Sequence, residues 1–240
     1  KNHEIVILYQ PKYDLLTERM IGAEALVRWK DPKGTLLLPE VFLPILQQER
    51  LLADLDFYII EEVCKRLKSL KEKGKRIYPV SIHLSVAHLQ TKDFMKRFIG
   101  IVEQYKIPIS YLNLEIDEKC FYDEPDTMLS FLLDLKELGF CTTLSHFGKN
   151  HASLDLIAKY PVDIIKLDLE YFRNHSLDDG SKVILQKTIE AAHALGKHVA
   201  TVGLETDLQK LFLSSIGCDY IQGYLYHKAL TSEDFEKYLM

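Results

Sequence analysis

Short apolar segments alternate with longer amphipathic segments along most of this sequence. The first two apolar segments, residues 4–13 and 21–29, flank a polar turn, and this arrangement predicts an antiparallel pair of strands. A helix is predicted from Pro39, and a longer one covers residues 54–73, where Leu55, Ile59 and Val63 recur at helical spacing. Six further strands are predicted at residues 78–84, 111–116, 140–146, 162–167, 199–203 and 219–222.

Helices of ten or more residues separate these later strands, and glycines follow several of them. Gly139, Gly196 and Gly217 stand where a C-cap turns the chain back toward a sheet. Short, apolar strands that alternate with helices predict parallel βα units. About eight strands favour a closed barrel, so the predicted fold is an α/β modified TIM (β/α)8 barrel with an antiparallel first strand. Such barrels use roughly 200–250 residues, which predicts one domain over residues 1–240.

Composition narrows the class of protein. The 240 residues are 47% hydrophobic and 27% charged, as in globular proteins, and the net charge of −5 argues against a nucleic-acid polymer or an anionic membrane as partner. No apolar run approaches the roughly 20 residues of a membrane span, and the four cysteines form no Cys-x-x-Cys pair, so we expect reduced thiols and a cytoplasmic location. The sequence begins at Lys1 and enters a strand almost at once, from which we expect a sensor or signalling domain upstream.

Polar residues gather where the predicted strands end. Ligands of α/β barrels bind at the carboxyl ends of the strands, and the polar residues there should form a ring around one mouth. Any one of them could be a buried polar group with its hydrogen bonds satisfied, but their convergence predicts a binding site. In chain order the residues at these ends are Glu24, Arg28, His83, Glu115, Asp117, Ser145, His146, Lys166, Asp168, Val202, Glu205 and Gln222.

Several separated motifs together resemble one family. They are Tyr9-Gln10-Pro11, Glu24-Ala25-Leu26-Val27-Arg28-Trp29, Leu55-Asp56, Leu114-Glu115-Ile116-Asp117-Glu118, Phe147-Gly148, Ile165-Lys166-Leu167-Asp168, Gly203-Leu204-Glu205-Thr206 and Gln222-Gly223-Tyr224. Their order and spacing resemble the EAL family from Gln10 to the last helix. The resemblance implies a cyclic di-GMP phosphodiesterase ancestry, in which two Mg²⁺ or Mn²⁺ ions activate water and the ring opens to linear pGpG.

The catalytic positions implied by the resemblance are only partly retained. Glu24, Glu115 and Lys166 match the family, but as vestiges of a larger metal-holding set. The remaining metal positions are occupied by His83, Ser145, His146 and Val202. Mg²⁺ and Mn²⁺ prefer anionic and carbonyl oxygens, so we expect no metal cofactor and no significant phosphodiesterase activity. A zinc-type site formed by His83, His146, Glu24 and Glu115 is an alternative, because imidazole and carboxylate are adequate zinc ligands.

The positions that grip the nucleotide in the family are retained. The ligand-binding set implied by the resemblance is Gln10, Glu24, Leu26, Arg28, Asp56, Glu205, Gln222 and Gly223. Arg28 carries a permanent charge in a fork suited to phosphate. Asp56 and Glu205 are carboxylates able to accept hydrogen bonds from the edge of a guanine.

Three functions remain open at this point. The first is a catalytically inactive cyclic di-GMP receptor that acts on an upstream domain or on a partner. The second is a protein-interaction module that no longer binds the nucleotide; changes in the loop at residues 149–152, at Val202 and at Leu169 favour it. The third is a residual or altered-metal phosphodiesterase. The resemblance also suggests a homodimer formed near that loop.

Overall fold

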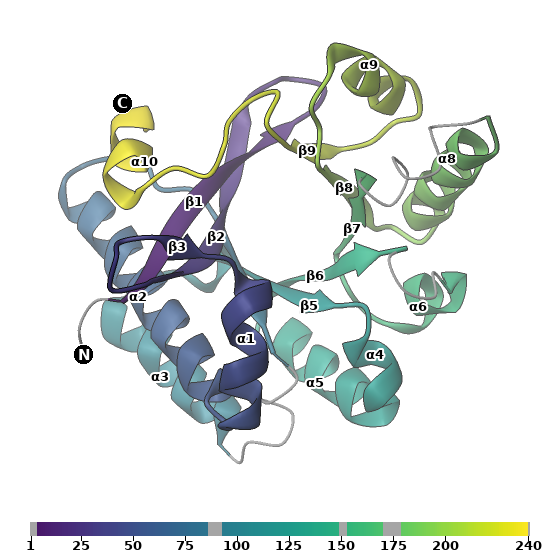
Figure 1. The fold of residues 1–240 in the computed structure, drawn as a ribbon. Coiled ribbons are helices and arrows are strands. Elements are labelled where there is room, and N and C mark those ends of the chain that lie inside the picture. Colours follow the sequence, from purple (N-terminus) through teal and green to yellow (C-terminus); the bar gives the residue numbers. More distant parts are fainter. Residues whose placement is uncertain (1–3, 86–92, 149–152, 170–178, 240) are drawn as a thin grey trace.

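The computed structural model describes residues 4–85, 93–148, 153–169 and 179–239, and the statements below concern these residues. Eight strands form a closed ring with helices around its outside (Figure 1). The ring closes because β1 pairs with both β2 and β9, antiparallel in each case, whereas the other neighbours in the ring are parallel. The predicted modified TIM barrel with an antiparallel first strand is confirmed.

The barrel strands are β1 (Ile5–Asp14), β2 (Met20–Lys30), β4 (Val80–Leu84), β5 (Leu112–Asp117), β6 (Cys141–Phe147), β7 (Ile164–Asp168), β8 (His198–Val202) and β9 (Tyr220–Gln222). Each lies within about two residues of a predicted strand. A ninth strand, β3 (Leu36–Leu37), was not predicted; it pairs with the outer end of β2 and takes no part in closing the ring. Two residues are too few for a pattern of alternation to be visible in a sequence.

The helices are α1 (Pro39–Gln48), α2 (Leu52–Glu72), α3 (Phe94–Tyr105), α4 (Cys120–Asp123), α5 (Pro125–Glu137), α6 (Leu154–Lys159), α8 (Asp179–Ala194), α9 (Asp207–Ser215) and α10 (Ser232–Tyr238). The predicted long helix is α2, which buries Ile59, Val63 and Leu67 on the face toward the barrel. Gly139 and Gly196 have φ values of 85° and 72°, as a left-handed C-cap requires. Apolar periodicity and glycine caps therefore position the helices that hold the barrel closed.

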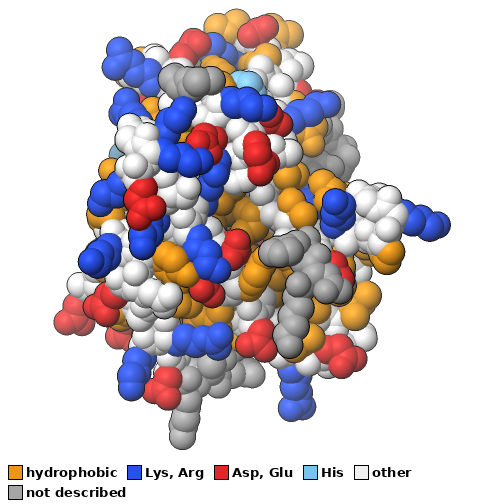
Figure 2. All heavy atoms as spheres, turned by 90° about the vertical axis from the view of Figure 1, so that its left-hand side faces the viewer, with side chains coloured by type: hydrophobic (Ala, Val, Ile, Leu, Met, Phe, Trp, Pro, Cys, Tyr) orange, Lys and Arg blue, Asp and Glu red, His pale blue; other side chains and the backbone are white. Residues whose placement is uncertain are grey.

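The surface is mixed in charge. Lysine and arginine side chains are interspersed with acidic ones on the face shown in Figure 2. Such a face lacks the one-sided basic field by which proteins attract nucleic acids. None of the helices in the described segments has both the length and the apolar character needed to cross a bilayer. All four cysteines are free thiols, as predicted.

Gly223 follows β9 at a point where the chain passes very close to another segment. A Cβ atom at this position would collide with the backbone of Leu204, whose own N–H donates to the carbonyl of Gln222 at 3.2 Å. We expect Gly223→Ala to lower the free energy of unfolding by about 1–3 kcal/mol or more, because backbone cannot yield as a side chain can. Gly100→Ala is the matched control, since nothing lies within 4 Å of a Cβ added there on α3. Urea unfolding of both variants tests this, and equal stabilities would contradict the close approach.

Candidate functional site

Three charged side chains meet inside one end of the barrel. Glu24 on β2, Glu115 on β5 and Lys166 on β7 are 3%, 0% and 3% exposed. Lys166 Nζ donates to Glu24 Oε2 at 2.7 Å and to Glu115 Oε2 at 2.8 Å. The lysine therefore joins a carboxylate from β5, two strands away in the ring, to one from β2, on the opposite side of the barrel.

A second lysine, Lys12 on β1, completes the charge balance. Its Nζ donates to Glu115 Oε1 at 2.5 Å and to Ser81 Oγ on β4 at 2.6 Å. Lys12 and Ser81 are additions that the motifs did not indicate. Lys12 stands two residues after Gln10, and strand alternation places such residues on the same face of β1, which is the only sequence signal for its position. Two carboxylates thus face two ammonium groups.

His83 on β4 lies against both carboxylates. Its Nε2 is 2.7 Å from Glu24 Oε1 and 3.2 Å from Glu115 Oε2, while 38% of its side-chain surface stays exposed at the mouth. The His146 ring on β6 lies beside it, with 5.9 Å between ring centroids. Glu24, His83 and Glu115 form the group of potential metal ligands found among the described residues, with ligand atoms within 4.8 Å of one another. His146 is not a member of that group, so the predicted four-residue zinc set is reduced to three.

Two glutamine side chains extend the network across the seam where the barrel closes. Gln10 on β1 lies opposite Glu24 in the β1–β2 register. Gln222 Nε2 on β9 donates to Gln10 Oε1 at 2.9 Å and to Glu24 Oε2 at 2.7 Å, and Gln10 Nε2 donates to the carbonyl of His227 at 3.1 Å. Gln10, Glu24 and Gln222 thus hold one another in fixed orientations.

Charge outweighs burial in deciding the protonation of this cluster. Burial alone would raise the pKa of Glu24, but Lys166 and the hydrogen bond to His83 hold that pKa well below its ordinary value. Burial and Glu24 would both raise the pKa of Glu115, yet Lys12, Lys166 and His83 together lower it to about 2. Burial opposes the charged forms of Lys166 and His83, but the carboxylates raise the pKa of both. The cluster is therefore a set of mutually supporting ions.

Comparison with known proteins assigns the family. The family model of the EAL domain matches residues 1–229. The chain belongs to the EAL domain family. Its relatives include cyclic di-GMP phosphodiesterases, and solved structures of the same fold include complexes with cyclic di-GMP.

Three relatives show how far the similarity of this EAL domain extends. YkoW, a signalling protein of Bacillus subtilis, is 29% identical over 240 residues, which cover all of this chain and 30% of YkoW. PdeR, a cyclic di-GMP phosphodiesterase of Escherichia coli, is 26% identical over 99% of this chain and 36% of its own length. The structure of the EAL enzyme Bd1971 with cAMP and cyclic di-GMP bound has a TM-score of 0.92 at 25% identity, covering all of this chain and 65% of that one. This EAL domain spans about a third of the length of these two curated relatives.

The other predicted nucleotide-binding residues of the EAL domain surround the network. Asp56 on α2 is buried and accepts from the backbone N–H of Ser85, two residues beyond His83, at 2.8 Å. Leu26 and Arg28 are partly buried and follow Glu24 on the same face of β2. Glu205 is exposed in the connection between β8 and α9, and Gly223 follows β9 at its close approach to Leu204. Their contact with a nucleotide stays a prediction.

The positions predicted to differ from the family lie at the same end of the barrel. Ser145 on β6 is fully buried, and Val202 on β8 pairs in register with Asp168 and Gln222. His146 has a φ of 57°, in the left-handed region. Leu169 is buried. The loop at residues 149–152, near which the homodimer was predicted, lies outside the described residues.

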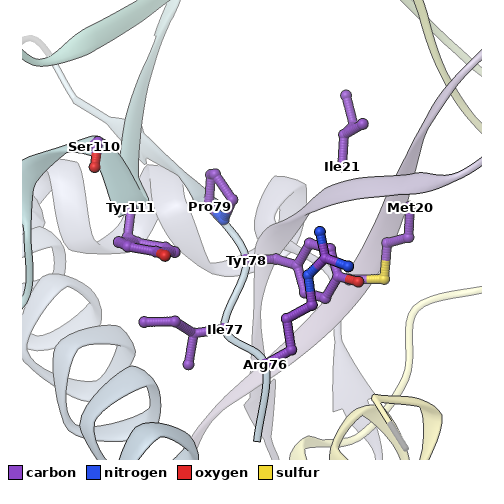
Figure 3. Close-up of a pocket in the computed structure, with 8 residues that line it drawn as sticks. All are labelled: Met20, Ile21, Arg76, Ile77, Tyr78, Pro79, Ser110 and Tyr111. Carbon is purple, nitrogen blue, oxygen red and sulfur yellow. The ribbon is translucent and has the colours of Figure 1, made fainter.

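A surface pocket of about 640 Å³ lies at the other end of the EAL domain barrel. Figure 3 shows Met20, Tyr78 and Tyr111, which stand at or before the first residues of β2, β4 and β5, with Arg76 beside Tyr78. The Arg76 guanidinium stacks 4.8 Å from the centroid of the Tyr78 ring. In α/β barrels this amino-terminal end serves stability rather than chemistry. The ion network at the carboxyl end is therefore the functional candidate.

The ion network of this EAL domain predicts a distinctive dependence of stability on pH. The lowered pKa values of Glu24 and Glu115 mean that their contribution is fully present above pH 4.5 and is lost as the pH falls toward 2. The raised pKa of His83 acts in the opposite sense: its contribution is full below pH 6.5 and is lost as the pH rises through the folded-state value. Urea unfolding from pH 2 to 8 should thus show highest stability in weakly acidic solution.

Glu115→Gln isolates the carboxylate part of this effect. We expect it to lower the free energy of unfolding by roughly 3 kcal/mol at pH 7 and by progressively less as the pH falls from 4.5 to 2. Glu137→Gln, at an exposed position of α5, controls for the loss of a carboxylate in general. A difference in the free energy of unfolding between the wild type and Glu115→Gln that does not change with pH would contradict the ion network.

Proposed function

We propose that this chain is a catalytically inactive EAL domain that acts in the cytoplasm as a receptor for cyclic di-GMP. One observation carries the proposal: all four oxygens of Glu24 and Glu115 already accept hydrogen bonds from nitrogen donors. Glu24 Oε2 accepts from Lys166 and Gln222, and its Oε1 faces His83. Glu115 Oε1 accepts from Lys12, and its Oε2 accepts from Lys166 and faces His83.

This donor set does not fit the pair of Mg²⁺ or Mn²⁺ ions that active relatives use. Mg²⁺ requires near-octahedral oxygen coordination and is bound through carboxylates, while Mn²⁺ also prefers carboxylate, carbonyl and water oxygens. Two carboxylates compensated by Lys12 and Lys166 leave no negative charge for four added positive charges. Ser145 and Val202 supply no anionic oxygen in exchange. Metal-activated attack of water on phosphorus accordingly has no place in the proposed function.

Nucleotide binding is supported by the groups that need no metal. Gln10 and Gln222 are already fixed by their mutual hydrogen bond, and Asp56 is buried next to the strand that bears His83. Groups held in place before binding lose little entropy when a ligand arrives. Arg28 supplies the charged fork for a phosphate. Solved EAL structures with cyclic di-GMP bound provide the analogy for the ligand.

Calorimetric titration of the purified chain with cyclic di-GMP tests the proposal. We expect micromolar binding that is unchanged when Mg²⁺ or Mn²⁺ replaces a chelator, and no pGpG on chromatography of the mixture after incubation. The absence of any heat of binding at high nucleotide concentration would contradict the receptor function and favour the protein-interaction module. Turnover in the presence of Mn²⁺ would overturn the inactivity and favour the residual phosphodiesterase.

A further inference from the structure

The pocket at the amino-terminal end of the barrel combines apolar walls with one charged group. Its volume is about 640 Å³, which is within the range of small-molecule sites. Figure 3 shows Tyr111 on one side of Ile77 and Pro79, with Tyr78 and Arg76 on the other. Arg76 is the sole ionised side chain among the eight residues that line the pocket. The pocket therefore offers apolar surface for the body of a ligand and a single positive charge for its head.

Arg76 is positioned to bind an anion. Its guanidinium lies over the ring of Tyr78, 4.8 Å from the centroid, and a guanidinium stacked in this way keeps its N–H donors at the free edge of the plane. Within the described segments, no carboxylate lies close enough to Arg76 to form an ion pair. Such an arginine suits a ligand carboxylate, which it can bind through two parallel hydrogen bonds.

The charge and shape of the pocket limit the class of ligand. One guanidinium balances one negative charge, so a monoanion fits, whereas a ligand with two phosphates would bring a second charge without a partner. Tyr111 and Tyr78 are partly buried and offer aromatic surface, against which a flat ring packs in a stacked or edge-on arrangement. Ser110 is exposed at the rim and adds a hydroxyl that can donate to a further acceptor. These features together favour a small aromatic acid.

We propose that this pocket is a second ligand site, which binds a small aromatic monocarboxylate with its carboxylate on Arg76 and its ring against Tyr111 and Ile77. The pocket is bordered by the starts of β2, β4 and β5, whose opposite ends carry the ion network. Tyr78 and His83 are five residues apart, which corresponds to roughly 16 Å of extended chain, so the ligand does not touch that network. Binding of this kind requires no catalytic group, and the proposal does not depend on cyclic di-GMP.

NMR titration of the ¹⁵N-labelled chain with benzoate tests the site, with benzyl alcohol and benzylamine as neutral and cationic probes of similar shape. We expect benzoate to saturate one site and to shift the amide signals of residues 76–78 and 110–111, while the signal of Gln222 at the mouth stays in place. The other two probes should bind at least roughly 10-fold more weakly, because neither brings a charged acceptor to the guanidinium. Equal affinities for the three probes, or shifts confined to the mouth, would overturn the site.

Arg76→Gln should weaken benzoate binding by at least roughly 10-fold, because it removes the charge and the fork from an exposed position. Arg97→Gln is the matched control: Arg97 is also exposed and also stacks on an aromatic ring, 3.8 Å from the centroid of Phe57, so its loss should leave benzoate affinity unchanged. Tyr111→Leu is a second variant that keeps the charge but removes the aromatic wall, and it should also bind more weakly. Equal benzoate affinities for Arg76→Gln and Arg97→Gln would contradict the proposal.

Discussion

Four substitutions at the barrel mouth should raise the rate at which this domain opens cyclic di-GMP to linear pGpG with Mn²⁺. The variant combines His83→Asn, Ser145→Asp, His146→Asp and Val202→Glu. At these positions the resemblance to the EAL family implies an asparagine, two aspartates and a glutamate as metal ligands. Restored carboxylates supply the anionic oxygens that a pair of hard ions requires. We expect turnover to rise at least roughly 100-fold above the wild-type background, the scale set by a single preorganised electrostatic contact.

The backbone of the wild-type chain is compatible with these changes. His146 has a φ of 57°, a region that aspartate tolerates better than most residues. Val202 is already in register with Gln222 on one side and Asp168 on the other, so a glutamate there would stand at the mouth.

Chromatography of the reaction mixture gives the readout for the quadruple variant. Adding Glu24→Gln to it should abolish the gain and so exclude a contaminating enzyme. The single variant Val202→Glu should remain inactive, because one added carboxylate is not enough to bind two metal ions. Turnover by the wild type equal to that of the quadruple variant would show that the lost ligands do not limit catalysis.

Arg28→Ala should weaken cyclic di-GMP binding by roughly 100-fold, because truncating one partner of a hydrogen-bonded charge pair commonly costs 2 kcal/mol or more. Arg28 lies on β2, four residues beyond Glu24 on the same strand face, and its Nη1 donates to its own neighbour's carbonyl, Val27 O, at 2.7 Å. Its loss therefore removes a charge from the mouth without breaking a hydrogen bond between strands. Calorimetric titration measures the effect.

Two further variants separate charge from geometry at this position. Arg28→Lys keeps the charge but loses the planar fork, so it should bind with intermediate affinity. Arg76→Ala removes an arginine at the opposite end of the barrel and should bind as the wild type does. Equal affinities for Arg28→Ala and Arg76→Ala would show that Arg28 does not contact the nucleotide.

Much of the fold was predictable because it depends on patterns that are local in the sequence. The period of α2, the glycines after α5 and α8, and the order of short strands each report a nearby backbone requirement. Closure of the ring was inferred from the number of strands, and the pairing of β1 with β9 bears it out. The two-residue β3 was missed because its pairing with β2 has no local signal.

The site divides in the same way. Sequence alone determined which ligand chemistry is present: two histidines, a serine and a valine stand where the resemblance implies oxygen ligands, and no folding can restore a missing carboxylate. The tertiary structure decided which donors face the two remaining carboxylates, Glu24 and Glu115. Lys12 reaches Glu115 from 103 residues away, and His83 rather than His146 joins the carboxylates. Such pairings are fixed by distances between strands on a closed ring, and a linear sequence does not contain those distances.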